Sequence, residues 1–194
     1  KTINANAFTP SKITSITVPK ETDNIVDGAF SQMNKLTEIN VEAGNPKYSS
    51  EDGILYETRS TGKYIKAYPY AKSGTTFTVP TGTYGVAINA FAKHPTLTTI
   101  NLPASIQDLP TSEEANGFTG ASALTAIKVD PSNGFYKDID GVVLTKDGKT
   151  LVTYPYKRDG VLNPTYNGTP AQHPGMVYKI PDGVEIVGQA AFAQ

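Results

Sequence analysis

Four short segments of the chain share one spacing of apolar residues. In each, an aliphatic residue is followed by isoleucine three positions later and by another aliphatic residue two positions after that. The segments are Ile13-Ile16-Val18, Leu36-Ile39-Val41, Leu97-Ile100-Leu102 and Leu124-Ile127-Val129. The last two apolar residues of each lie two apart, so they point to one face of a strand. We therefore expect four short strands side by side in a parallel sheet, because a unit of this size cannot bury its apolar face without neighbours.

A phenylalanine precedes each of these segments by five or six residues, usually after an alanine. These residues are Phe8, Phe30, Phe91 and Phe118. We expect short helical or irregular turns to begin at these pairs, on the side opposite the strands. The matching positions also predict one buried stack of rings, formed by Phe30, Phe91, Phe118 and Phe192. Short strands combined with such turns predict a β-rich α/β fold.

A longer cassette occurs twice, over residues 36–91 and 124–192. Asn45 and Asn133 are offset by 88 positions, and so are Asp52 and Asp140. Each copy carries an Asp-Gly, a β-rich run and a Tyr-Pro-Tyr motif, which together predict an inserted β-hairpin. The offset at the closing Ala-Phe grows to 101 positions, which indicates a surface loop inserted around 163–175. Because stacked repeats share one core, we expect residues 1–194 to form a single elongated domain.

These motifs resemble the BspA-like class of bacterial leucine-rich repeats, in which L-x-x-I-x-L-P units alternate with Ala-Phe pairs. The residues that carry the resemblance are Leu97 to Pro103, Ile106, Leu109, Val184, Ile186, Ala191 and Phe192. The resemblance implies a leucine-rich-repeat solenoid with short parallel strands, short helical turns and inserted β-hairpins. It also implies an exported protein of the bacterial cell surface, and it implies a scaffold without specifying an activity. After Leu109 the expected pair is delayed to Gly117-Phe118, which indicates a short extra loop.

Composition and charge narrow the possible functions. The 194 residues include 17 Gly and 14 Pro, with only 18% charged residues, which is typical of a turn-rich β protein. The net charge of -1 and the lack of a basic stripe disfavour nucleic-acid binding. The sequence shows no apolar run long enough for a membrane span. The chain starts at Lys1 within repeat sequence, so we expect the signal peptide of the exported protein to lie outside it.

Candidate catalytic residues are scarce, and we expect a non-catalytic protein without a cofactor. The chain has no cysteine, which excludes thiol catalysis and thiolate metal sites. Its two histidines, His94 and His173, each precede a proline, and we expect both to face solvent in loops. None of the common motifs for nucleotide binding, zinc hydrolysis or serine nucleophiles is present.

An oxygen-rich segment raises the question of calcium. Its residues are Asp130, Asn133, Asp138 and Asp140. Oxygen ligands in one loop are what Ca²⁺ prefers, but the equivalent positions of the first cassette are Glu42, Asn45, Ser50 and Asp52. We favour the alternative that Asn133 and Asp140 hold turns through side-chain hydrogen bonds to the backbone, and we predict no metal site.

Two surfaces are candidates for recognition. The strand positions that alternate with the apolar ones form a predicted binding face: Ser15, Thr17, Glu38, Asn40, Thr99, Asn101, Ala126 and Lys128. Solenoids use such extended faces for binding, although the same residues also suit a solvated sheet. The second candidates are Tyr70 and Tyr156, which close the two Tyr-Pro-Tyr motifs. They are positioned either to stack on sugar rings or to pack within the scaffold.

We therefore expect a repeat domain that mediates protein binding or adhesion at the bacterial surface. A glycan-binding module that uses Tyr70 and Tyr156, and a pure structural spacer, are the alternatives. Because neither end of the sequence looks like a polar cap, we also expect either a fragment of a longer repeat protein or end-to-end self-association.

Overall fold

The computed structural model describes residues 1–5, 7–8, 11–110, 116–157 and 178–192. Every regular element among these residues is a strand, and none of them is helical. The strands are β1 (Thr2–Ile3), β2 (Ser15–Val18), β3 (Asn24–Ile25), β4 (Glu38–Val41), β5 (Tyr48–Glu51), β6 (Ile54–Arg59), β7 (Gly62–Ala67), β8 (Thr76–Thr78), β9 (Thr83–Val86), β10 (Thr99–Leu102), β11 (Ala126–Val129), β12 (Tyr136–Ile139), β13 (Val142–Thr145), β14 (Thr150–Thr153) and β15 (Ile186–Val187).

The expectation of an α/β fold with helical turns is therefore wrong, and the chain is a β-solenoid. The residue before the Ala-Phe pair has a positive φ in three copies, at Gly28 (75°), Asn89 (60°) and Ala190 (53°). Such a conformation interrupts a right-handed helix. The pairs instead close single turns, as where the Ala29 N–H donates to the Val26 carbonyl at 3.1 Å.

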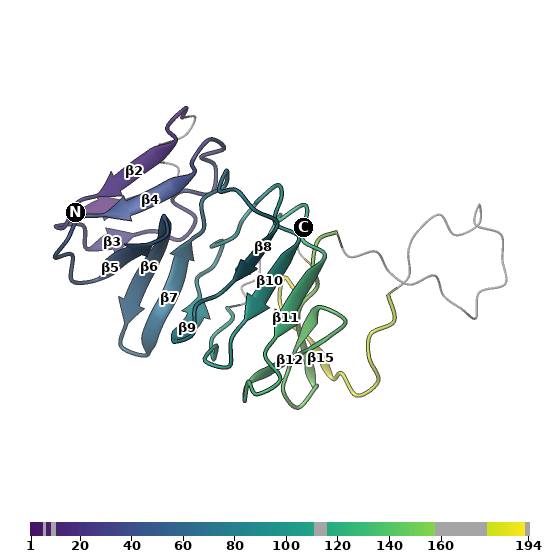
Figure 1. Cartoon of the computed structure of the whole chain (residues 1–194). Helices are drawn as coiled ribbons and strands as arrows, with labels where there is room; N and C mark the ends of the chain where they lie inside the picture. Colours follow the sequence, from purple (N-terminus) through teal and green to yellow (C-terminus); the bar gives the residue numbers. More distant parts are fainter. Residues whose placement is uncertain (6, 9–10, 111–115, 158–177, 193–194) are drawn as a thin grey trace, which may run out of the picture.

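All four predicted strands are present, as β2, β4, β10 and β11. They pair in parallel as two couples, β2 with β4 and β10 with β11, and β8 adds to the free side of β10. They do not form one continuous sheet, because β5, β6, β7 and β9 form a separate sheet of their own. Figure 1 shows this sheet between the couple β2–β4 and the strands β8, β10 and β11, along the long axis of the molecule.

Both predicted hairpins are confirmed, and each is part of a larger meander. The first consists of β5, β6 and β7, and the second of β12, β13 and β14, with antiparallel pairing throughout. The Asp-Gly pair forms the two-residue turn before β6 and again before β13. Asp52 and Gly53 have φ values of 50° and 70°, and Asp140 and Gly141 have values of 51° and 84°. Positive φ at both central residues is the conformation for which Asp-Gly is favoured in hairpins.

Each of these turns lies tightly against a solenoid strand. A Cβ on Gly53 would come within 2.7 Å of the Glu38 Cβ, and one on Gly141 would come within 2.7 Å of the Ala126 Cβ. The Ile39 N–H donates to the Gly53 carbonyl at 2.8 Å, and the Ile127 N–H donates to the Gly141 carbonyl at 2.9 Å. The turns therefore fix the meanders onto β4 and β11.

The core is divided along the axis into three apolar clusters, of which the largest lies at the centre. The predicted stack of four phenylalanines is divided in the same way. Phe91 stacks on Phe118 at 5.5 Å between ring centroids, whereas Phe30 stacks on Phe8 at 6.1 Å in a different cluster. Phe192 is 40% exposed. The prediction of a single stack is therefore wrong, because the meander inserted after β4 separates the layer of Phe30 from that of Phe91.

Candidate functional site

The predicted binding face is divided between two sheets. On the couple β2–β4, Ser15 lies opposite Glu38 and Thr17 opposite Asn40. On β10 and β11, Thr99 lies opposite Ala126 and Asn101 opposite Lys128. The register therefore places the predicted residues on adjacent strands within each half, and the halves belong to different sheets.

The half on β2 and β4 is an exposed hydrogen-bonded cluster. The Ser15 hydroxyl donates to Glu38 Oε1 at 2.7 Å, and Asn40 Nδ2 donates to the same oxygen at 3.3 Å. These polar groups satisfy one another on an open surface, where the Glu38 carboxylate remains accessible.

The other half borders a groove of about 360 Å³ at the carboxyl ends of β8, β10 and β11. Asn101 and Lys128 of the predicted face line it, together with Thr78, Asp130 and two prolines that end strands, Pro103 and Pro131. Asn101 Nδ2 donates to the Thr78 hydroxyl at 3.0 Å. The Lys128 side chain is 51% exposed and lies 3.4 Å from the Asp138 carboxylate. The groove therefore combines apolar side chains with a lysine, an aspartate, and hydroxyl and amide groups, a mixture suited to recognition.

The first cassette has a smaller hollow at the corresponding place, after β4. Its volume is about 230 Å³, and its lining extends from Val41 to Asn45 and from Tyr48 to Ser50. The first cassette lacks a cation at this position, because Lys128 of the second cassette corresponds to Asn40 of the first. Both cassettes therefore have a depression after a solenoid strand; a lysine and an aspartate line the larger one, whereas Glu42 lines the smaller one.

The side chains of the oxygen-rich segment bind backbone groups. Asn133 Nδ2 donates to the carbonyls of Pro103 (3.1 Å) and Ile106 (2.8 Å), and its Oδ1 accepts two backbone N–H groups. Asp138 accepts the N–H groups of Val129 (2.8 Å) and Gly141 (3.0 Å). Among the described residues no group of three or more histidine or acidic side chains is placed to hold a metal ion. The geometry of Asn133 agrees with the turn-holding interpretation.

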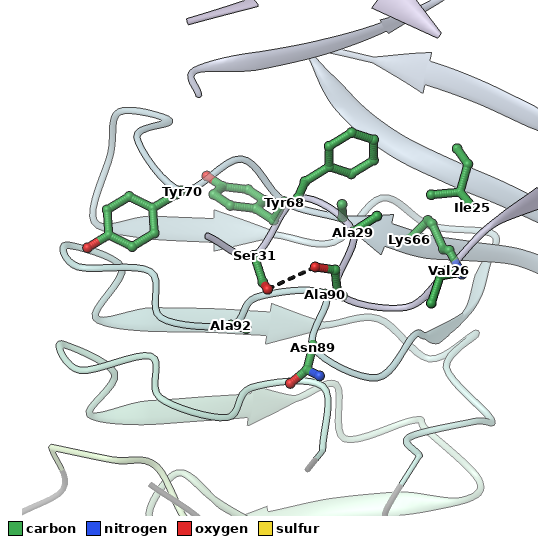
Figure 2. A pocket seen from close by; sticks show the side chains of 13 residues that line it. Ile25, Val26, Ala29, Ser31, Lys66, Tyr68, Tyr70, Asn89, Ala90 and Ala92 are labelled. Carbon is green, nitrogen blue, oxygen red and sulfur yellow. Dashed lines mark hydrogen bonds between the residues drawn. The ribbon is translucent and has the colours of Figure 1, made fainter. Parts of the chain in front are cut away.

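The two candidate tyrosines differ in exposure. Tyr156 is 41% exposed, whereas Tyr70 is only partly exposed and lines a small pocket between the turn at Ala29-Phe30 and β7. Figure 2 shows Tyr70 next to Tyr68 at one end of this pocket and Lys66 at the other. The pocket has a volume of about 10 Å³, room for no more than about one water. Tyr156 is therefore the better placed of the two to stack on a ligand. The loop around 163–175 lies outside the described residues.

The expectation that His94 faces solvent is wrong. His94 is fully buried, its Nδ1 accepts the Leu97 N–H at 3.1 Å, and its Nε2 lies 3.2 Å from the Lys72 carbonyl. Its ring also packs on Tyr68 at 5.1 Å. Burial lowers the pKa of His94, although the hydrogen bond to Lys72 acts in the opposite direction. The imidazole thus joins two backbone groups inside the core, a role that the neighbouring proline does not indicate. His173 lies outside the described residues.

Sequence reasoning missed a buried charged cluster on the first meander. Glu57 is 5% exposed and Lys66 is 6% exposed. Arg59 Nε donates to the Glu57 carboxylate at 2.8 Å, and Lys47 Nζ lies 3.1 Å from the same carboxylate. Lys66 pairs with Asp27. Burial alone would raise the pKa of the Glu57 carboxyl, but the hydrogen bond from Arg59 and the charges of Lys66 and Lys47 hold it below its usual value.

The sequence did contain a signal for this charged cluster. Glu57 corresponds to Thr145 at the offset of 88. After the hairpin turn the offset is 86, as between Tyr68 and Tyr154, so Lys66 corresponds to Val152. Val152 is 6% exposed, as Lys66 is. A charged residue that corresponds to a buried apolar residue of the other cassette is expected to be buried too, and it therefore needs a partner of opposite charge.

The chain is similar to known repeat proteins. The family described as "BspA type Leucine rich repeat region" matches residues 1–112 and, in an overlapping match, residues 59–137, with six copies of the repeat. Comparison with curated proteins finds no significant match. Of the described residues, none forms a helix long and apolar enough to cross a membrane.

Three solved structures share the fold. A leucine-rich cell surface protein from Faecalibacterium prausnitzii is 26% identical, with a TM-score of 0.55 over 65% of this chain and 32% of the other. A leucine-rich repeat protein from Eubacterium ventriosum is 23% identical, with a TM-score of 0.50 over 66% and 39%. The pneumococcal vaccine antigen PcpA is 20% identical, with a TM-score of 0.62 over 96% and 38%. The chain therefore spans about a third of the length of the structures that it resembles.

Proposed function

Because the chain belongs to the BspA-type leucine-rich repeat family, we propose that it is a non-catalytic repeat domain of the bacterial cell surface that binds a protein partner. The cell-surface location is supported by the similarity to the leucine-rich cell surface protein of Faecalibacterium prausnitzii, which is 26% identical over part of its length. Adhesion would then be the activity of this domain within a longer surface protein.

The groove at the ends of β8, β10 and β11 carries the proposal. Its volume of about 360 Å³ exceeds that of the hollow after β4, and it holds Asn101 and Lys128 of the predicted face. The accessible apolar part of its lining comes from Pro103 and Pro131, because Leu102 and Val129 are nearly inaccessible. An extended protein segment that fits here would place apolar side chains against these prolines and an acidic group near Lys128, in competition with Asp138. Desolvated centres with polar rims are typical of protein interfaces.

A panel of immobilised extracellular-matrix and serum proteins tests this proposal. We expect saturable binding of the wild-type domain to at least one of them. The triple variant Thr78→Ala, Asn101→Ala and Lys128→Ala should weaken that binding by about tenfold or more, which is the loss of about 1.4 kcal/mol. The matched control, Ser15→Ala with Glu38→Ala and Asn40→Ala, removes the hydrogen-bonded cluster on β2 and β4 and should leave binding unchanged. Equal binding by the wild type and the groove variant would contradict the proposal.

Glycan binding through Tyr156 is a second candidate, favoured by the exposure of its ring. An exposed tyrosine ring offers a flat face for stacking on a sugar. A glycan panel run in the same format, with Tyr156→Ala compared against Tyr70→Ala, separates this function from protein binding. Binding that is lost in Tyr156→Ala alone would support the glycan module.

A further inference from the structure

Lys66 is held in direct contact with a carboxylate from a distant part of the chain. It lies on β7, 6% exposed, and its Nζ pairs with Asp27 of the turn that follows β3, 39 residues earlier. Asp27 is itself partly covered, with 37% of its side chain exposed. Holding an amine against a carboxylate group lowers the entropic barrier to a reaction between them.

The surroundings of Lys66 exclude most water. It lines the small pocket in Figure 2 with Ile25, Ala29 and Tyr68, all of them buried, and the pocket has a volume of about 10 Å³. The uncharged form of an amine is the nucleophile that attacks a carbonyl carbon, so Lys66 must first lose a proton.

A second carboxylate is positioned to move the protons. Glu57 Oε2 lies 3.9 Å from Lys66 Nζ, with only 7% of the Glu57 side chain exposed. The Glu57 carboxylate is ionised at neutral pH because its pKa is lowered. It is therefore a weak base that would hold the Lys66 proton only transiently, as a relay. Arg59 and Lys47 hold the Glu57 carboxylate in place from the other side.

We propose that Lys66 and Asp27 form a covalent side-chain amide, an isopeptide bond, with Glu57 as the proton relay. The Lys66 ammonium transfers one proton to Glu57, and the resulting amine attacks Cγ of Asp27. A C–N bond forms, a C–O bond breaks, and the departing oxygen leaves as water after it takes up the two protons that the nitrogen loses, one of them through Glu57. An ammonium and a carboxylate thus become one amide and one water, with no oxidant, reductant or cofactor.

The bond ties the first layers of the solenoid to its first meander. Asp27 lies beside the core cluster that contains Ile25 and Phe30, and Lys66 lies on the strand that leads into Tyr68 of the central cluster. A cross-link closing a loop of this length restricts the unfolded chain in the way a disulfide does. In a chain without cysteine, it supplies the same kind of constraint.

The meander itself offers a matched control. Lys63 on β7 pairs with Glu51 on β5 at 2.7 Å, but 35% and 59% of these side chains are exposed. Neither side chain of this pair is buried as Lys66 is, so we expect it to remain an ordinary ion pair. Lys63→Arg should therefore leave the covalent bond intact.

Mass spectrometry of the intact, denatured wild-type protein tests the proposal directly. We expect a mass lower than that of the sequence by one water, and proteolysis should release one branched peptide that joins the segments around Asp27 and Lys66. Lys66→Arg, Asp27→Ala and Glu57→Gln should each restore the full mass, and Lys63→Arg should not.

A wild-type mass equal to that of the sequence would overturn the proposal, and so would a water loss that persists in Lys66→Arg. The bond can form only in the folded protein, so circular dichroism must first show that Glu57→Gln is folded before its full mass counts as loss of the relay. If the wild type has lost one water and Glu57→Gln has lost it too, the bond exists but Glu57 is not its proton relay.

Discussion

The two cassettes attach their meanders to the solenoid with the same hydrogen bonds but fill them with different side chains. Asn45 Nδ2 donates to the carbonyls of Pro19 (3.1 Å) and Thr22 (2.9 Å), while Asn133 donates to two carbonyls at 3.1 and 2.8 Å. Both side-chain oxygens accept two backbone N–H groups that follow them. Tyr68 packs on Phe91 at 5.2 Å and 30°, and Tyr154 on Phe192 at 5.1 Å and 31°.

The side chains within the meanders differ in charge. The first cassette carries four ionised groups where the second carries apolar or neutral ones, together with a single aspartate. The positions Lys47, Glu57, Arg59 and Lys66 correspond to Phe135, Thr145, Asp147 and Val152. Residues that satisfy backbone groups are therefore retained because the turn geometry requires them. Residues inside the meander vary freely as long as each buried charge has a partner, because a buried charge without one is strongly destabilising.

The aromatic pairs give the largest expected contrast between the cassettes. Phe91 is fully buried and Phe192 is 40% exposed, although each contacts a tyrosine in the same way. We expect Phe91→Ala to lower the free energy of unfolding by about 3–5 kcal/mol. Phe192→Ala should lower it by about 1–2 kcal/mol, because less apolar surface is lost. Urea denaturation measures both, and equal losses would show that burial does not distinguish the two positions.

The paired asparagines test where the cassettes agree. Both make the same kind of hydrogen bonds, so replacing either one should lower the free energy of unfolding. Asn133 is fully buried and Asn45 is partly buried. Asn133→Ala leaves two carbonyls and two N–H groups without partners and should cost about 2–3 kcal/mol, with about 1–2 kcal/mol for Asn45→Ala.

Aspartate at the same positions is the control for this prediction. Asn133→Asp keeps the acceptor but turns a second oxygen toward the carbonyls of Pro103 and Ile106. Denaturation at pH 7 should therefore find it at least as destabilising as alanine. A neutral effect of Asn133→Asp would contradict the hydrogen-bond assignment.

Much of this architecture could be predicted from the sequence because it depends on local patterns. The spacing by two in Ile100 and Leu102 defines a strand face, and the β-rich run before each Tyr-Pro-Tyr motif predicts a hairpin, with no reference to distant residues. Comparison of the cassettes also favoured a turn-holding role for Asn133 over a role as a calcium ligand. These features involve residues that are close together in the sequence or that occur in both cassettes.

The remainder depends on contacts between distant segments, which the sequence does not display. The burial of His94 depends on the Lys72 carbonyl, 22 residues away. The two-part binding face results from a meander that separates β4 from β8. The absence of helix in the described residues results from positive φ at Asn89 and Ala190, residue types that do not reveal such a conformation by themselves.

The Asp-Gly turns provide a smaller test of equivalence. Asp52 has a φ of 50°, a conformation that asparagine and aspartate tolerate better than alanine does. We expect Asp52→Ala to cost about 1 kcal/mol and Asp52→Asn to change the free energy of unfolding by only a few tenths. Asp140→Asn should likewise be tolerated. Thermal denaturation compares the variants, and equal effects of alanine and asparagine at position 52 would rule out the backbone explanation.

The smallest expected effect is the pH dependence due to His94, which lies just after the first cassette. Its pKa is lowered in the folded protein from the usual 6.5, so below that pH the unfolded chain takes up a proton that the folded protein resists. The stability that depends on neutral His94 is complete above about pH 6.5 and is lost as the pH falls below it, by at most about 1.4 kcal/mol per pH unit. Glu57 has its pKa lowered from 4.5 and gives a separate loss only below that value.

Unfolding measured between pH 7 and pH 5 in a His173→Asn background isolates this effect, because His94 is then the sole histidine. NMR titration of its ring in the same protein gives the folded pKa independently. A ring that titrates at or above pH 6.5, with stability constant from pH 7 to pH 5, would mean that His94 is solvated. The imidazole would then be no part of the core around Tyr68, and the ion pairs of the first meander alone would distinguish the two cassettes in their response to pH.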